Sequence, residues 1–104
     1  MCANHAAAAR QTRQLQAELT RRIEGITVVD ARSETGNLSG TGNHVECASV
    51  VLFSAELTQG EIESAMAEYC AAQDAVWAVK QTGEGVWRFY MERPAPFPDN
   101  IEGH

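Results

Sequence analysis

The sequence has no long apolar run. Uninterrupted apolar stretches such as Val50–Phe53 are only a few residues long, whereas a membrane-spanning helix needs about 20 residues. The N-terminus also lacks the apolar run that forms a signal peptide. We therefore expect a cytoplasmic protein that is neither membrane-spanning nor exported.

Basic residues are scarce. Eight Lys and Arg stand against fourteen Asp and Glu, which gives a net charge of -6. This balance disfavours bulk electrostatic attraction to nucleic acid or to an anionic membrane. The first 25 residues nevertheless carry a net charge of +2 and the remainder -8. The basic surface is therefore expected to be local, on one segment.

Cysteines are few and odd in number. Cys2, Cys47 and Cys70 follow no metal-ligand spacing, so a disulfide framework is not expected in a reducing cytosol. Cys47 falls in a predicted strand and Cys70 on the apolar side of a predicted helix, where cysteine behaves as a small hydrophobe. A reactive thiol is the alternative interpretation.

What is present suits one small folded domain. Hydrophobic residues make up 44% of the 104 residues and charged residues 21%, which are the proportions of a globular protein. A chain of this length can close around one core. We expect a single domain over residues 1–93 and an extended, Pro-containing C-terminal tail over residues 94–104.

Two segments are predicted to be helical. Ala3–Glu24 is rich in good helix formers and ends at Gly25. The second helix begins with Thr58 as N-cap and Glu61 as its capping-box partner, and runs to about Ala72. In the first helix the spacing predicts a buried stripe, namely Ala8, Thr12, Leu15, Leu19 and Ile23. Arginines collect on the opposite, water-facing side, namely Arg10, Arg13 and Arg21.

Four segments are predicted to be strands: Ile26–Arg32, Val45–Ser54, Ala75–Gln81 and Val86–Glu92. Ser33–His44, with three glycines, predicts a mobile loop between the first two strands. The order α-β-β-α-β-β predicts an α+β fold, with a four-stranded, mostly antiparallel sheet and two helices packed on one face. The other face would then carry alternate side chains, in one register Val79, Arg88 and Tyr90.

The last two predicted strands form an aromatic hairpin around Thr82–Gly85, and its register is open. Strict four-residue closure pairs Gln81 with Val86 and places Trp77 and Tyr90 on the face opposite Phe89 and Met91. A bulge at a glycine instead brings Trp77 and Trp87 together on one face.

No catalytic constellation is complete in the sequence. His44-Val45-Glu46 is similar to the His-x-Glu part of zinc deaminase sites, but the Pro-Cys-x-x-Cys pair that such sites need does not follow. His44 and Cys47 would point to opposite faces of a strand, which argues against a nucleophile and its base. We expect no metal, no cofactor and no enzymatic activity.

The leading hypothesis is a non-enzymatic protein-binding module that occludes a surface of a larger protein or protein complex. Aromatic and arginine side chains dominate such interfaces, and the acidic second helix and the hairpin supply the expected contact residues: Glu61, Glu68, Trp77, Trp87, Arg88 and Tyr90. An uncovered sheet face or edge also leaves a homodimer open.

Two other classes of function are kept as alternatives. A nucleic-acid-binding domain would use the arginines of the first helix, Arg10, Arg13 and Arg21. A small ligand-binding or enzymatic α+β domain would place His44 and the glycine-rich loop at the mouth of a pocket, with Cys47 as a reactive thiol.

In size and acidity the chain resembles the small inhibitors that phages and mobile elements direct against host or defence proteins, including anti-CRISPR proteins. The resemblance is one of profile, without a shared motif, and implies no residue roles. An inhibitor of this kind could mimic nucleic acid with its carboxylates, namely Asp30, Glu34, Glu46, Glu61, Glu63 and Glu68. Because the charge density is modest, we expect a mixed polar and aromatic interface instead.

Overall fold

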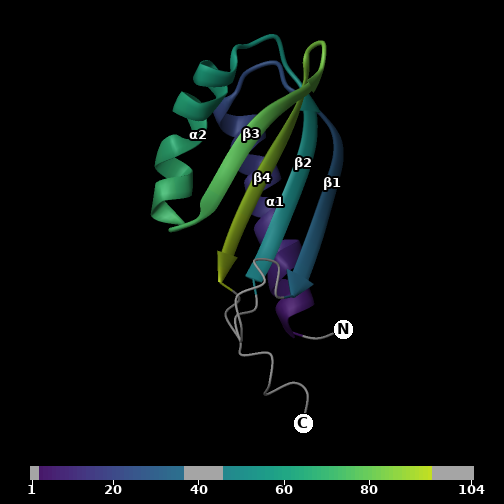
Figure 1. The fold of residues 1–104 in the computed structure, drawn as a ribbon, viewed down its shortest axis with the longest axis vertical. Coiled ribbons are helices and arrows are strands. Elements are labelled where there is room, and N and C mark those ends of the chain that lie inside the picture. The colour runs from purple at the N-terminus through teal and green to yellow at the C-terminus, as the bar shows by residue number, and fades with distance from the viewer. Residues whose placement is uncertain (1–2, 37–45, 95–104) are drawn as a thin grey trace.

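The computed structural model describes residues 3–36 and 46–94 of the chain (Figure 1). It contains two helices and four strands in the order α1 (Ala3–Arg22), β1 (Thr27–Gly36), β2 (Glu46–Ser54), α2 (Gln59–Ala72), β3 (Val76–Gly83) and β4 (Val86–Pro94). This is the predicted α-β-β-α-β-β order. None of the helices in these two ranges has both the length and the apolar character needed to cross a membrane.

The four strands form one antiparallel sheet in the order β1-β2-β4-β3. The central position of β2 follows from its composition, since it is the most apolar strand and pairs on both sides. β1 and β3 are the edges of the sheet. The predicted four-stranded antiparallel sheet is confirmed.

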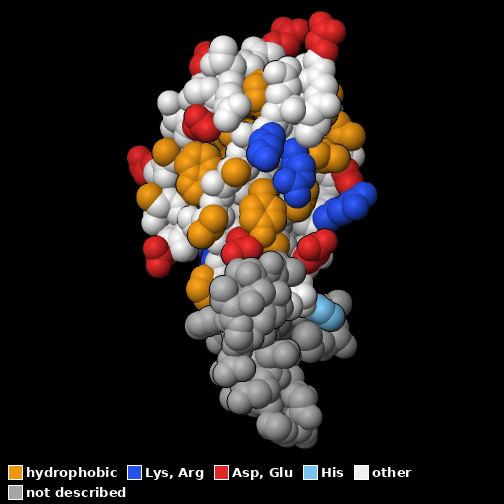
Figure 2. Space-filling model, viewed as in Figure 1, with side chains coloured by type: hydrophobic (Ala, Val, Ile, Leu, Met, Phe, Trp, Pro, Cys, Tyr) orange, Lys and Arg blue, Asp and Glu red, His pale blue; other side chains and the backbone are white. Residues whose placement is uncertain are grey.

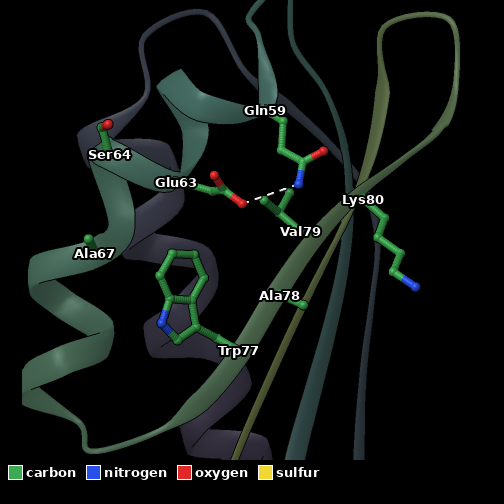
Figure 3. A pocket seen from close by; sticks show the side chains of 8 residues that line it. All are labelled: Gln59, Glu63, Ser64, Ala67, Trp77, Ala78, Val79 and Lys80. Atoms are coloured by element: carbon green, nitrogen blue, oxygen red, sulfur yellow. Dashed lines mark hydrogen bonds between the residues drawn. The ribbon is translucent and has the colours of Figure 1, made fainter.

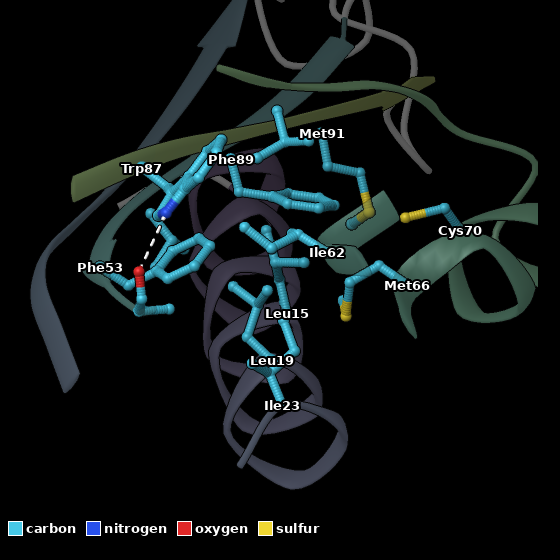
Figure 4. Packing of buried hydrophobic residues seen from close by; sticks show 13 residues of the cluster. Leu15, Leu19, Ile23, Phe53, Ile62, Met66, Cys70, Trp87, Phe89 and Met91 are labelled. Atoms are coloured by element: carbon cyan, nitrogen blue, oxygen red, sulfur yellow. Dashed lines mark hydrogen bonds between the residues drawn. The ribbon is translucent and has the colours of Figure 1, made fainter. Parts of the chain in front are cut away.

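Both helices cover the same face of the sheet. α1 runs behind the strands and α2 lies beside β3 (Figure 1). Alternate residues of the central strands pack against the apolar stripes of the helices (Figure 4). The most deeply buried residues of this core, from helices and strands together, are Leu15, Leu19, Val51, Phe53, Ile62, Met66, Phe89 and Met91. The predicted stripe on α1 is buried throughout, and Arg10, Arg13 and Arg21 are exposed.

A polar cluster joins α1 to the sheet within this core. The Nε2 group of Gln11 donates to the carbonyl oxygen of Cys47 and to the hydroxyl of Ser49, each at 3.0 Å. The hydroxyls of Thr12 and Ser49 lie 2.7 Å apart, and the Ser33 hydroxyl donates to that of Thr12 at 2.7 Å. Because buried polar groups need these partners, the cluster fixes the position of α1 over β1 and β2.

The hairpin adopts the bulged register. Gln81 pairs with Trp87 and Gly83 with Val86, with the irregularity between Gln81 and Gly83. Trp77 and Trp87 therefore share the helix-covered face, and the strict four-residue closure is wrong. Val79 pairs with Phe89 on this same face and is 2% exposed. The expectation that Val79 faces the open side is wrong for this reason.

The first strand is longer than the sequence predicts. β1 continues to Gly36, so Ser33–Gly36 belong to the sheet instead of the predicted loop. Their pairing with Glu46–Ser49 of β2 overrides the weak strand propensity of Ser, Glu and Gly. The rest of the predicted loop and the tail beyond Pro94 lie outside the described residues.

Candidate functional site

Neither α1 nor α2 covers the other face of the sheet. The side chains that alternate with the core residues on β2 and β4 point to it, among them Val50, Leu52, Arg88 and Tyr90, and each is partly buried by its neighbours. Figure 2 shows this face, where hydrophobic side chains are interspersed with basic and acidic ones.

The strand register arranges these side chains in rows across the sheet. Tyr90 lies in the middle row, between Val50 of β2 and Ala78 of β3, and Arg32 continues this row on β1. The row on one side contains Lys80, Arg88, Leu52 and Asp30, and the row on the other contains Val76, Glu92, Ala48 and Glu34. We define the sheet-face patch as Arg32, Glu34, Val50, Leu52, Arg88, Tyr90 and Glu92.

The aromatic ring at the centre of the patch is held by two charged neighbours. The Tyr90 hydroxyl donates to Oε1 of Glu92 at 2.5 Å, and the guanidinium carbon of Arg88 lies 5.6 Å from the centroid of the Tyr90 ring. Burial, followed by the hydrogen bond to Glu92, raises the pKa of Tyr90 to about 12. At neutral pH Tyr90 is therefore an uncharged, pre-oriented aromatic side chain.

Only two of the six predicted contact residues lie together on this face, Arg88 and Tyr90. Trp87 is 4% exposed, and its Nε1 group donates to the carbonyl oxygen of Ala55 at 3.2 Å. Trp87 is an expected contact residue, but its side chain lies on the same face of β4 as Phe89 and Met91 and packs in the core between the sheet and the helices. Trp77 is half-buried on the helix-covered face and stacks on Phe89 with 5.6 Å between ring centroids.

The two predicted carboxylates lie on α2, away from the sheet-face patch. Glu61 is exposed but accepts a hydrogen bond from the Thr58 backbone nitrogen at 2.9 Å, which completes the predicted capping box. Glu68 is exposed further along the helix. The six predicted residues therefore do not form one continuous surface.

The arginine stripe of α1 faces away from the sheet. Arg10, Arg13 and Arg21 are all exposed, as the helical spacing predicts. Glu18 also lies on this helix, and Arg21 and Arg22 each approach it at 2.7 Å. The hydrogen bonds from Arg22 and Arg21 lower the pKa of Glu18, so the stripe is less basic than a count of its arginines indicates.

The cysteines in the described residues are buried. Cys47 of β2 is 2% exposed, and Cys70 of α2 is 0% exposed. Burial raises the pKa of Cys70 to about 11, so its thiol is uncharged at neutral pH. His44 lies outside the described residues, and the site proposed for it is untested. Over residues 3–36 and 46–94 no three His, Cys, Asp or Glu side chains group in a way that could hold a metal ion.

Sequence reasoning missed most of the sheet-face patch. The available signal was the alternation within Val45–Ser54, in which every second side chain points away from the helices. The apolar composition of this segment predicts only a buried central strand and does not distinguish Val50 and Leu52 from the core residues beside them. Arg32, Glu34 and Glu92 join them only through the register of three strands.

Comparisons with protein-family models, with curated proteins and with solved structures find no match for this chain.

Proposed function

We propose that this protein is a non-enzymatic protein-binding module that covers a surface of a larger protein or protein complex. The observation that supports the proposal is the position of Tyr90 between Val50 and Ala78, at the centre of the sheet face that neither α1 nor α2 covers. Tyrosine and arginine on a partly apolar surface are typical of protein interfaces. The sheet-face patch is the contact surface in this proposal.

The charge of the patch favours a protein over a nucleic acid as partner. Arg32 and Arg88 are balanced by Glu34 and Glu92 within the patch. A phosphate backbone needs a surface of one sign, whereas a protein surface of mixed charge can match both signs. The net charge of -6 on the whole chain acts in the same direction.

The proposal extends to the mode of action and the location. A small module that occupies a functional surface of its partner acts as an inhibitor by steric exclusion, without chemistry of its own. This is the role that its size and acidity suggest, in the cytoplasm. The aromatic hairpin contributes through Arg88 and Tyr90, and the two tryptophans stabilise the strands that present them.

The proposal is tested by photo-crosslinking in cells of the native host. A benzoylphenylalanine at position 52, within the patch, should crosslink to one partner, and the same residue at position 13, on the outer side of α1, should not. Tyr90→Ala and Arg88→Glu should abolish the crosslink from position 52, with a loss of binding of at least about 2 kcal/mol expected for a central aromatic anchor.

Arg13→Ala is the matched control, since Arg13 is exposed and lies on the other side of the molecule. Circular dichroism of each variant should match the unmodified protein. Equal crosslinking from positions 13 and 52, or a crosslink that survives both patch substitutions, would refute the proposed surface. A crosslink between two copies of the chain would show that the patch is a homodimer interface and not a surface for another protein.

A further inference from the structure

A groove separates α2 from the outer edge of β3. It has a volume of about 510 Å³ and is lined by Gln59, Glu63, Ser64 and Ala67 of α2 and by Trp77, Ala78, Val79 and Lys80 of β3. Figure 3 shows the Trp77 ring directed toward α2 while Ala78 and Lys80 point away from it. Residues on both faces of β3 line the groove, so the backbone edge of the strand forms one of its walls.

The backbone groups along this edge pair with no strand in the part of the chain that the structure describes. Among the described strands β3 pairs only with β4. In an antiparallel strand the N–H and C=O groups point alternately to either side, so half of those in β3 are directed into the groove or its opening. An extended peptide can complete such a ladder by adding as a further strand.

The opposite edge of the sheet is less suited to strand addition. β1 has a register shift between Val28 and Asp30 and alternates charged side chains along its length. β3 keeps a regular register over residues 76–81, where Lys80 is the one charged residue. Bulges and charges are the features that protect an edge, so β3 is the more receptive of the two.

The side chains around the groove indicate which peptide it fits. The Trp77 ring is fixed by stacking on Phe89, with 13° between the ring planes. Across the groove the Glu63 carboxylate accepts a hydrogen bond from the Gln59 amide at 3.2 Å, and the charged side chains of α2 are all acidic. An indole face and a carboxylate together favour a guanidinium or ammonium group.

We propose that the groove between α2 and β3 binds an extended basic segment of another protein, which pairs with the edge of β3 and places an Arg or Lys side chain between Trp77 and Glu63. This interaction goes beyond the proposed function, because the groove is lined by α2 and β3, and the sheet-face patch contains no residue of either element. Peptide residues at alternate positions would contact Ala78 and Val76, which is 69% exposed.

A second copy of the chain is a poorer occupant. Pairing of β3 with β3 of another copy places both α2 helices on the same side of the joined sheet, each beside the shared edge. Their acidic side chains, among them Glu63, would then face one another. An isolated peptide strand brings no such helix and carries the complementary charge.

The test uses a capped hexapeptide of alternating valine and arginine, added to the isotope-labelled full chain. We expect the largest amide shift changes at residues 76–80 and a change in Trp77 fluorescence. The same peptide with N-methyl groups on alternate amides keeps its side chains but cannot complete the ladder. It should bind at least about tenfold more weakly, since two or three hydrogen bonds are lost.

Substitutions on α2 separate the charge contribution from the backbone contribution. Glu63→Gln should weaken binding of the arginine peptide by about three- to tenfold, as expected for one partly buried charge-assisted contact. Glu68→Gln is the matched control, because Glu68 is an exposed carboxylate of the same helix that does not line the groove. It should leave binding within about twofold of the unmodified protein.

Several outcomes would overturn the proposal. One is the absence of amide shift changes at residues 76–80 with about 1 mM peptide, and another is a set of shift changes centred on Arg88 and Tyr90. Equal binding of the N-methylated and unmodified peptides would also contradict it, as would shift changes along β3 that grow with protein concentration in the absence of peptide. The last would assign the edge to a second copy. Arg32→Ala, in the sheet-face patch but on β1, which β2 and β4 separate from β3, should leave peptide binding unchanged. Failure of this proposal and failure of the proposed function are therefore distinguishable.

Discussion

The hydroxyl of Tyr90 donates a hydrogen bond to the carboxylate of Glu92, two residues further along β4, with 2.5 Å between the oxygen atoms. Residues two apart in a strand lie on the same face, so this contact is built into β4. The hydrogen bond joins the central ring of the sheet-face patch to the neighbouring row of side chains, which contains Glu92 and Glu34. Loss of the phenolic proton would place two negative charges at this distance, and protonated Tyr90 is therefore favoured in the fold.

Alkaline pH should destabilise the protein in two overlapping steps. The pKa of Cys70 is raised from 9.0 to about 11 and that of Tyr90 from 10.0 to about 12. The folded state holds both protons more tightly than the unfolded state, so their stabilising contributions are complete below pH 9 and are lost as the pH rises through 11 and 12. Urea denaturation at several pH values should show a midpoint that falls across this range.

The Tyr90→Phe variant should lose less stability between pH 10 and 12 than the unmodified protein does, because it has no phenol to ionise. A difference titration of tyrosinate absorbance between the two proteins reports the pKa of Tyr90 directly. Cys70→Ala should affect the lower part of the range, from pH 9 to 11. Identical pH profiles for all three proteins would contradict the assignment.

The two tryptophans of the hairpin should differ sharply in their effect on stability. Trp87→Ala empties a core position and leaves the Ala55 carbonyl oxygen without its donor, for an expected loss of about 3–5 kcal/mol. Trp77→Ala removes a half-buried ring stacked on Phe89 and should cost about 1 kcal/mol. Chemical denaturation of both variants, followed by circular dichroism, measures the difference. Equal losses would show that Trp77 is as much a core residue as Trp87.

The polar cluster under α1 should make removal of Ser49 costly. Ser49→Ala takes a partner from both Gln11 and Thr12 and should lower the free energy of unfolding by about 1–3 kcal/mol. Thr12→Val should lower the free energy of unfolding less in the Ser49→Ala variant than in the unmodified protein, because the Thr12 and Ser49 hydroxyls are hydrogen-bond partners and both are then absent. Thr20→Ala, on the exposed side of α1, is the control and should stay within about 0.5 kcal/mol. Additive losses in the double variant would argue against a connected cluster.

Two glycines should respond in opposite ways to alanine. Gly85 in the hairpin has φ of 71°, and Gly85→Ala should cost about 1–2 kcal/mol from backbone strain alone, because the nearest atom to an added Cβ is 4.0 Å away. Gly60 lies in the first turn of α2, where an added Cβ meets nothing within 4 Å. Gly60→Ala should stabilise the protein by up to about 1 kcal/mol. Thermal unfolding of the pair is the measurement, and a stabilising Gly85→Ala would contradict the hairpin geometry.

The register of the β3–β4 hairpin is a property that the sequence leaves open. The turn residues Thr82–Gly85 predict a tight hairpin but leave two registers, which differ in whether Trp77 shares a face with Trp87 and Phe89 or with Tyr90. The bulged register places Trp77, Val79 and Trp87 on the helix side. Two of the six expected contact residues, Arg88 and Tyr90, lie on the open face. Which face of β4 the helices cover, and with it the burial of Trp87, depends on the packing of the assembled sheet.

Local sequence alone determined the elements of this protein: the apolar stripe of α1, the capping box of α2 and the order of helices and strands each depend on residues a few positions apart. Tertiary structure decided the rest. The register of four strands placed Arg32, Val50 and Tyr90 in one row and left the edge of β3 open beside α2. These relationships join residues tens of positions apart, and a shift of one residue in any strand turns its side chains to the other face, so only the assembled sheet fixes them.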